Sequence, residues 1–213
     1  NPSGEVVVRT DDLKIWFPIK RGVLRKTIGH IKAVDGIDAV VRAGQTLGIV
    51  GESGSGKTTL GLALLRLIPS SGPIVYMGKA IDGYNAKAMR PLRKDMQIVF
   101  QDPYGSLSPR LSIQQIVEEG LMVQGKRLTF EERRARVASA LTEVGLDPES
   151  MDRYPHEFSG GQRQRIAIAR ALAVSPKLIV CDEPVSALDV SIRAQVLNLL
   201  QDLQARLGLA LVF

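Results

Sequence analysis

The sequence has little of what disulfide-stabilised or membrane-spanning proteins need. Its single cysteine, Cys181, excludes a disulfide within the chain and is compatible with a reducing compartment. No apolar run approaches the ~18 residues that cross a bilayer as a helix. No secretory signal opens the sequence either. We therefore expect a soluble protein that reaches any membrane through a partner.

Charge of one sign is only modestly in excess. The 28 Lys and Arg residues outnumber the 22 Asp and Glu residues, for a formal net charge of +6 and a pI near 9.6. Such an excess can indicate a nucleic-acid or acidic membrane partner. In 90–95 and 131–134, however, basic residues stand beside acidic ones. This mixture favours an ordinary solvated surface.

The 213 residues, 45% of them apolar, suit one medium domain. Short apolar runs predict strands, and apolar residues at helical spacing predict helices. Strands are expected at 6–8, 12–17, 39–41, 46–50, 96–100, 177–181 and 209–213, and helices at 57–67, 160–175 and 192–206. Alternating strands and helices predict a layered α/β fold.

Three other stretches carry local signals. Residues 18–31, basic and with Pro and Gly, are expected to form a loop, whereas 102–158 reads as polar and helical, with a capping box at 129–132. Because the chain begins with Asn and ends within an apolar run, we interpret it as a piece of a longer one.

A phosphate-binding loop is predicted between an expected strand and an expected helix. The segment 51–58 matches G-x-x-x-x-G-K-[ST] at every specified position. Its residues are Gly51, Glu52, Ser53, Gly54, Ser55, Gly56, Lys57 and Thr58. Glycines let successive N–H groups face the phosphates at a positive helix end. Lys57 then reaches the β- and γ-phosphates and Thr58 suits Mg²⁺, which predicts a site for ATP and Mg²⁺.

Two acids, Asp182 and Glu183, end the apolar run 177–181. We expect Asp182 to hold Mg²⁺ through a metal-bound water, and Glu183 to polarise a water for attack on the γ-phosphate. Adjacent acids also occur in solvated turns, but the phosphate loop favours the catalytic interpretation. Cys181, beside them, is expected to be a small buried strand residue without a redox role.

The segment 158–162, Phe-Ser-Gly-Gly-Gln, resembles the L-S-G-G-Q signature of the ABC ATPases, with Phe158 in place of Leu. In that family two domains sandwich two ATP molecules head to tail. The resemblance implies that Ser159, Gly160, Gly161 and Gln162 contact the nucleotide of a facing domain. It also adds Thr59, beside the phosphate loop, to the nucleotide-binding residues.

Further motifs match the same family. Gln101 corresponds to the glutamine that touches Mg²⁺, and Asp189 ends the motif at 186–189 that crosses the dimer interface. Trp16 and Phe17 are candidates for stacking on adenine, with Phe17 preferred and core packing as the alternative for both rings. The family's switch histidine follows the strand at 209–213, where this chain ends, so we expect weak hydrolysis. His30 and His156 are expected to be ordinary polar residues.

The resemblance implies a P-loop NTPase (RecA-like) core with a parallel sheet, an N-terminal antiparallel β part, and a helical subdomain at 102–158 within an ATP-binding domain spanning 1–213. Segments 18–31, 101–110 and 154–162 resemble the peptide/nickel importer ATPases. The run 16–22 is similar to the second half of fused two-domain subunits.

Such a protein powers import of peptides or similar solutes at the cytoplasmic face of the inner membrane. Its implied partners are permease subunits, a second ATP-binding domain and, indirectly, a solute-binding protein, with no nucleic acid. The alternative is a soluble ABC ATPase acting on ribosomes or DNA, which basic charge would favour.

Overall fold

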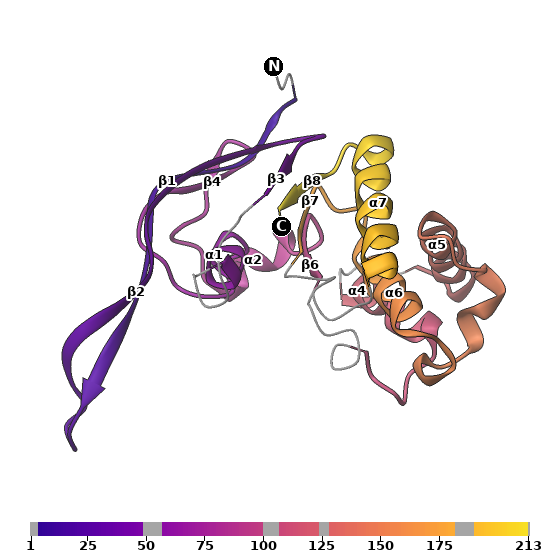
Figure 1. Cartoon of the computed structure of the whole chain (residues 1–213), viewed down its shortest axis with the longest axis horizontal. Helices are drawn as coiled ribbons and strands as arrows, with labels where there is room; N and C mark the ends of the chain where they lie inside the picture. The colour runs from indigo at the N-terminus through magenta and orange to yellow at the C-terminus, as the bar shows by residue number, and fades with distance from the viewer. Residues whose placement is uncertain (1–3, 49–56, 100–106, 124–127, 182–189, 213) are drawn as a thin grey trace.

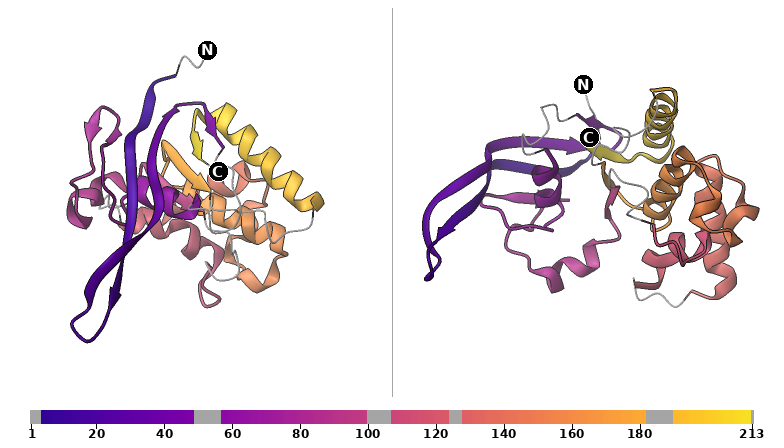
Figure 2. Two further views of the ribbon diagram at one scale, coloured as in Figure 1. Left: turned by 60° about the vertical axis from the view of Figure 1, so that its left-hand side comes forward. Right: turned by 60° about the horizontal axis from the view of Figure 1, so that its bottom comes forward.

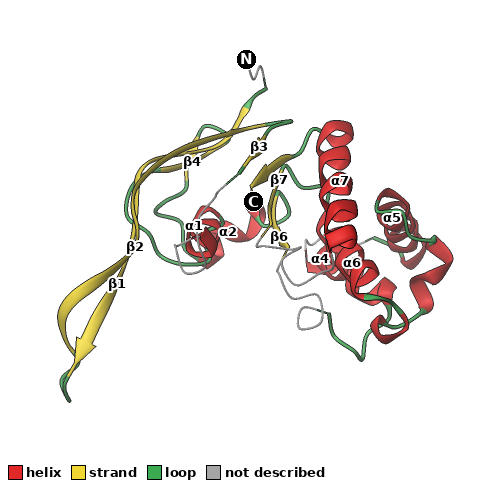
Figure 3. Cartoon of the chain, viewed as in Figure 1, coloured by secondary structure: helices red, strands yellow, loops and turns green. Residues whose placement is uncertain are grey.

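The structure, a computed structural model, describes residues 4–48, 57–99, 107–123, 128–181 and 190–212. The elements form an antiparallel sheet, a parallel sheet and a group of helices. Figures 1 and 3 show the parallel sheet between the other two parts. This arrangement confirms the predicted α/β class with an antiparallel β part.

The antiparallel sheet has the strand order β2-β1-β4-β5. Its strands are β1 (Val6–Arg21), β2 (Lys26–Arg42), β4 (Ile74–Tyr76) and β5 (Lys79–Ala80). β1 and β2 form one long hairpin, and β4 pairs with β1 only at 8–10. Beyond that short pairing the hairpin extends from the body as a two-stranded ribbon (Figure 2).

The loop expected at 18–31 was wrong, because these residues continue both strands around a turn at 22–25. Proline usually argues against a strand, since it cannot donate to a ladder. Pro18 is paired with His30 in the register. In a two-stranded ribbon each strand has one unpaired edge, so the N–H group that proline lacks need not break the ladder. Several register shifts along β1 and β2 accommodate the irregular pattern.

The parallel sheet has the order β3-β8-β7-β6. Its strands are β3 (Thr46–Leu47), β6 (Met96–Val99), β7 (Leu178–Cys181) and β8 (Ala210–Val212). Every residue of β7 and β8 is buried, as expected of central parallel strands covered on both faces. The helices α1 (Lys57–Leu64) and α7 (Val190–Leu207) belong to this part. Both were predicted, and α1 ends earlier than expected, ahead of Arg66 with φ +56°.

The main helices are α4 (Ile113–Val123), α5 (Phe130–Glu143) and α6 (Gly160–Leu172). Two short elements lie between β5 and β6, and two lie between the helices α5 and α6. They are α2 (Ala86–Met89), η1 (Arg90–Leu92), η2 (Pro148–Asp152) and η3 (Pro155–Glu157). Among the residues that the structure describes, no helix combines the length and apolar character that crossing a membrane requires.

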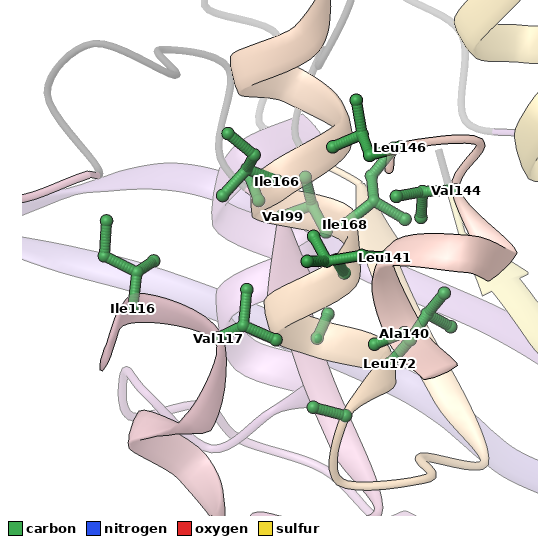
Figure 4. Packing of buried hydrophobic residues seen from close by; sticks show 14 of the residues in the cluster. Val99, Ile116, Val117, Ala140, Leu141, Val144, Leu146, Ile166, Ile168 and Leu172 are labelled. Atoms are coloured by element: carbon green, nitrogen blue, oxygen red, sulfur yellow. The ribbon is translucent and has the colours of Figure 1, made fainter. Parts of the chain in front are cut away.

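The helices α4, α5 and α6 pack on one another (Figure 4) in a core that continues onto α7 and one face of the parallel sheet. The predicted face of α5, Val137, Ala140 and Leu141, is buried there. The capping box of Thr129 and Glu132 begins α5 as predicted, with Glu132 N donating to Thr129 Oγ1 at 3.2 Å. A helical region after β6 is therefore confirmed for the described residues between 107 and 158.

Candidate functional site

The parallel strands β3, β6 and β7 end at one edge of their sheet. Val99, the last residue of β6, lies opposite Cys181, the last residue of β7, and β8 runs parallel to both β3 and β7. Ligands of open α/β sheets bind beyond this carboxyl edge. The predicted site segments follow these three strands in sequence: 51–56 after β3, Gln101 after β6, and 182–189 after β7.

Most of the predicted catalytic and metal-binding residues lie outside the described part of the chain. These are Gly51, Glu52, Ser53, Gly54, Ser55, Gly56, Gln101, Asp182, Glu183 and Asp189. Lys57 and Thr58 are described as the first residues of α1, by their backbone. The structure therefore describes the strands and helices that lead into the site, together with α6.

Helix α1 is held directly against strand β7. Leu60, Ala63 and Leu64 are buried in the core next to the antiparallel sheet. On the same helix, a Cβ added to Gly61 would lie 2.8 Å from Val180 Cγ1, closer than ordinary carbon contacts of ~3.5–4.0 Å. Gly61 thus permits the close approach of α1 to β7, two residues before Asp182. Sequence reasoning missed this residue, although a glycine inside a predicted helix is itself a signal of close packing.

The N-terminus of α6 carries the predicted signature. Ser159 is the N-cap, its Oγ accepts from Gln162 N at 3.3 Å, and Gln162 Oε1 accepts from Ser159 N at 3.0 Å. The first N–H groups of a helix have no intrahelical partner, and the helix dipole favours negative charge there; Gly161 itself is buried. Both Ser159 and Gln162 are exposed.

The start of α6 is anchored by its neighbours. Phe158, the residue that departs from the signature, is 8% exposed within the helical core. Arg163 Nε donates to Pro155 O at 2.8 Å and ties the helix to η3. The apolar substitution at position 158 therefore keeps the packing role that a leucine would have.

Gln164, one turn into α6, is an unexpected polar residue in the interior. Its side chain is fully buried, and neither its Oε1 nor its Nε2 has a hydrogen-bond partner in the part of the chain that the structure describes. A buried unpaired amide is costly. No signal in the sequence predicted that this glutamine would be buried.

Cys181 has the packing role expected from the sequence. It is buried at the end of β7, and burial raises the pKa of its thiol to about 12. The neutral thiol is a weak nucleophile and a poor metal ligand, which fits a structural role beside the predicted carboxylates.

Neither aromatic candidate for adenine stacking lies in the core, so the alternative of core packing is wrong. Trp16 and Phe17 are 40% and 41% exposed on β1. Trp16 Nε1 donates to Asp35 Oδ1 at 3.2 Å, and Lys32 Nζ lies 4.5 Å from the centroid of the indole ring. His156 is exposed on η3 beside Tyr154, as expected of an ordinary polar residue.

Residues 34–186 match the family described as "ABC transporter", and the chain belongs to this family. It is 62% identical, over 99% of its own length and 39% of the relative's, to the peptidoglycan transport ATP-binding protein YejF of Agrobacterium fabrum. It is 47% identical to the oligopeptide transport ATP-binding protein AppF of Bacillus subtilis, over 98% of its length and 64% of the relative's. The chain thus spans between about a third and two thirds of its curated relatives.

Solved structures agree with this family and with the fold. A structure of cbiO1 from Clostridium perfringens, part of the ABC transporter complex cbiONQ, matches with a TM-score of 0.81 and 31% identity, over 98% of this chain and 77% of that one. The ATP-binding cassette MJ0796, a dimer bound to ADP and Pi, matches with a TM-score of 0.81 and 29% identity, over 96% and 86%. The predicted ABC resemblance and P-loop NTPase fold are confirmed.

Proposed function

We propose that the chain binds ATP with Mg²⁺ at the carboxyl edge of its parallel sheet. The observation that carries this proposal is the common edge at which β3, β6 and β7 end, because a predicted group of site residues follows each strand. The phosphate-binding set is Gly51, Glu52, Ser53, Gly54, Ser55, Gly56, Lys57, Thr58 and Thr59. Carboxylate, hydroxyl and amide oxygens suit Mg²⁺, and the Mg²⁺ set is Thr58, Gln101 and Asp182.

The chain hydrolyses this ATP with Glu183 as the base. Its carboxylate accepts a proton from the attacking water, while Lys57 stabilises charge on the phosphate oxygens. Bound Mg²⁺ neutralises negative charge on the phosphates. Phe17, exposed on β1, is the proposed adenine contact.

Measurements of nucleotide binding and of turnover distinguish the role of Lys57 from that of Glu183. Lys57→Ala should lose binding of a fluorescent ATP analogue, whereas Glu183→Gln should keep binding and lose phosphate release. Glu149→Gln, an exposed carboxamide substitution on η2, is the control for both measurements. Equal turnover by Glu183→Gln and the unmodified chain would contradict the assignment of the base.

A second ATP-binding domain completes the site. Ser159, Gly160, Gly161 and Gln162, with Asp189, act on the nucleotide of the facing domain, which is supported by the exposed N-terminus of α6. ATP then closes the pair because its γ-phosphate makes contacts that ADP cannot make. Glu183→Gln should dimerise in Mg-ATP, measured by light scattering, and a monomer under these conditions would count against the closed pair.

The ATPase powers import of peptides or similar solutes across a membrane. The names of the relatives, which include ATP-binding proteins of oligopeptide transport and of glutathione import, support this class of cargo. The domain spans 1–213, and its helical subdomain at 102–158 transmits closure to permease subunits at the cytoplasmic face of the inner membrane. A solute-binding protein delivers the cargo.

A pull-down of the tagged protein from detergent-solubilised membranes tests the transport role. Multi-span permeases should be recovered and identified by mass spectrometry. Recovery of ribosomes or nucleic acid without permeases would replace import with the soluble ABC ATPase function.

A further inference from the structure

The end of the β1–β2 hairpin presents two aliphatic side chains to solvent. Val23 and Leu24 are 102% and 94% exposed in the turn, which the bond from Arg25 N to Gly22 O closes at 3.1 Å. Figures 1 and 2 show the turn end of the hairpin leading away from the rest of the antiparallel sheet and from the parallel sheet. Such exposure contributes nothing to the folded core, so a binding role explains these side chains better than a structural one.

The excess positive charge of the chain is concentrated on this hairpin. Residues 13–34 contain six Lys and Arg and no Asp or Glu, which leaves 22 residues of each sign in the rest of the chain. The mixture of signs found at 90–95 and 131–134 is absent from this stretch. Arg21, Arg25 and Lys26 flank the two aliphatic residues and are exposed. Among the described residues, none of these three cations has an ion pair.

The hairpin also has the reach that contact with a surface requires. From Ile15 to Arg21, the last residue before the turn, the ribbon is seven residues long, or about 23 Å at strand spacing. β4 pairs with β1 only nearer the base. The aliphatic tip can therefore meet a flat surface while the two sheets and the helices stay in water.

We propose that this hairpin tip, residues 21–26, binds the surface of an anionic lipid bilayer. Val23 and Leu24 enter the boundary between headgroups and acyl chains, and Arg21, Arg25 and Lys26 bind lipid phosphates. This pairing of apolar and basic residues is the chemistry of interfacial membrane anchors. A nucleic acid is bound by cations together with stacking aromatic rings, and the tip has no aromatic residue.

The contact goes beyond the proposed transport function, because it is made to lipid itself and needs no permease. The full chain is mixed with vesicles of phosphatidylcholine alone or with about one third phosphatidylglycerol. Sedimentation should recover the protein with the anionic vesicles only, and salt should release it. Trp16, the single tryptophan, lies on the hairpin and should transfer energy to a dansyl-labelled lipid.

Two variants of the tip separate the charged from the apolar contribution. A basic residue near an anionic surface contributes about fivefold in affinity. The affinity of R21Q/R25Q/K26Q for anionic vesicles should therefore fall about 100-fold. V23S/L24S should lose at least tenfold. Matched controls are K79Q/K87Q/R90Q, with the same change in net charge, and M122S/V123S on α4, all at exposed positions. Both controls should bind within about twofold of the unmodified chain.

The proposal is overturned if the chain binds neutral and anionic vesicles equally, or neither. It is also overturned if both tip variants bind vesicles as the unmodified chain does, or if the tip binds single-stranded RNA and not vesicles. ATP-analogue binding is measured on the same samples. If a tip variant loses vesicle binding but keeps nucleotide binding, the effect is due to the tip alone. If no sample binds the nucleotide, the proposed ATP site is refuted and the vesicle result still stands.

Discussion

The substitution Gly61→Ala tests whether α1 depends on its close approach to β7. The added Cβ would lie 2.8 Å from Val180 Cγ1, so one of the two elements must move by about 1 Å to restore an ordinary contact. Val180 is 4% exposed in a strand paired on both sides, and its β-branched side chain is stiff. Helix α1 should therefore move, together with Lys57 and Thr58 at its start.

The size of the effect follows from two opposing contributions. Overpacking a core costs about 1–3 kcal/mol, whereas alanine in place of glycine stabilises a helix by about 1 kcal/mol. The net loss of unfolding free energy should be about 0–2 kcal/mol. Because Val180→Ala removes the clashing methyl group, Gly61→Ala in that background should be stabilising by about 1 kcal/mol.

A double-mutant cycle over Gly61 and Val180, measured by urea unfolding with unchanged m-values, gives the coupling directly. We expect a coupling of about 1–3 kcal/mol. If Gly61→Ala changes stability equally in both backgrounds, within about 0.5 kcal/mol, the close packing of α1 on β7 is refuted as the reason for this glycine.

Gly120 offers a matched control on α4. A Cβ there would also lie 2.8 Å from a valine Cγ1, that of Val174, but in the helical part. Gly120→Ala should lower stability by a similar amount and leave affinity for a fluorescent ATP analogue unchanged. Gly61→Ala should weaken that affinity, and equal nucleotide affinity in the two variants would contradict the link between α1 and the phosphate loop.

Three further measurements test single residues. Gln164→Leu removes a buried amide without hydrogen-bond partners among the described residues, so urea titration should show a gain of about 1–3 kcal/mol; a loss would mean that the amide is bonded. Thr129→Ala breaks the capping box of α5 and should cost about 1 kcal/mol, whereas Thr142→Ala, within the same helix, should cost nothing. The raised pKa of Cys181, about 12 against an ordinary 9.0, stabilises the fold fully below that ordinary value, and this stability is lost as pH rises from there toward 12. The stability difference between the unmodified chain and Cys181→Ala should therefore shrink by about 1 kcal/mol between about pH 8 and pH 10; a constant difference would contradict the raised pKa.

Signals that depend on neighbours in the sequence predicted much of the fold. The capping box at Thr129 was found where the pattern indicated, because it is satisfied within one helical turn. The strands predicted at 96–100 and 177–181 are found as the paired strands Met96–Val99 and Leu178–Cys181, since apolar side chains have no polar alternative to burial. The long ribbon at 18–31 was missed because its pairing joins residues across a turn, without a hydrophobic face to mark it.

The sequence by itself determined which chemistry to expect of this protein, because a phosphate loop, two adjacent acids and a signature segment are each recognisable from a few consecutive residues. Only the tertiary structure decided how distant segments meet. It established the strand order β3-β8-β7-β6, the contact of Gly61 with Val180 and the exposure of the hairpin tip at Val23 and Leu24. Residue type and spacing indicate which chemistry a segment can perform, whereas burial and contact depend on packing between residues far apart along the chain.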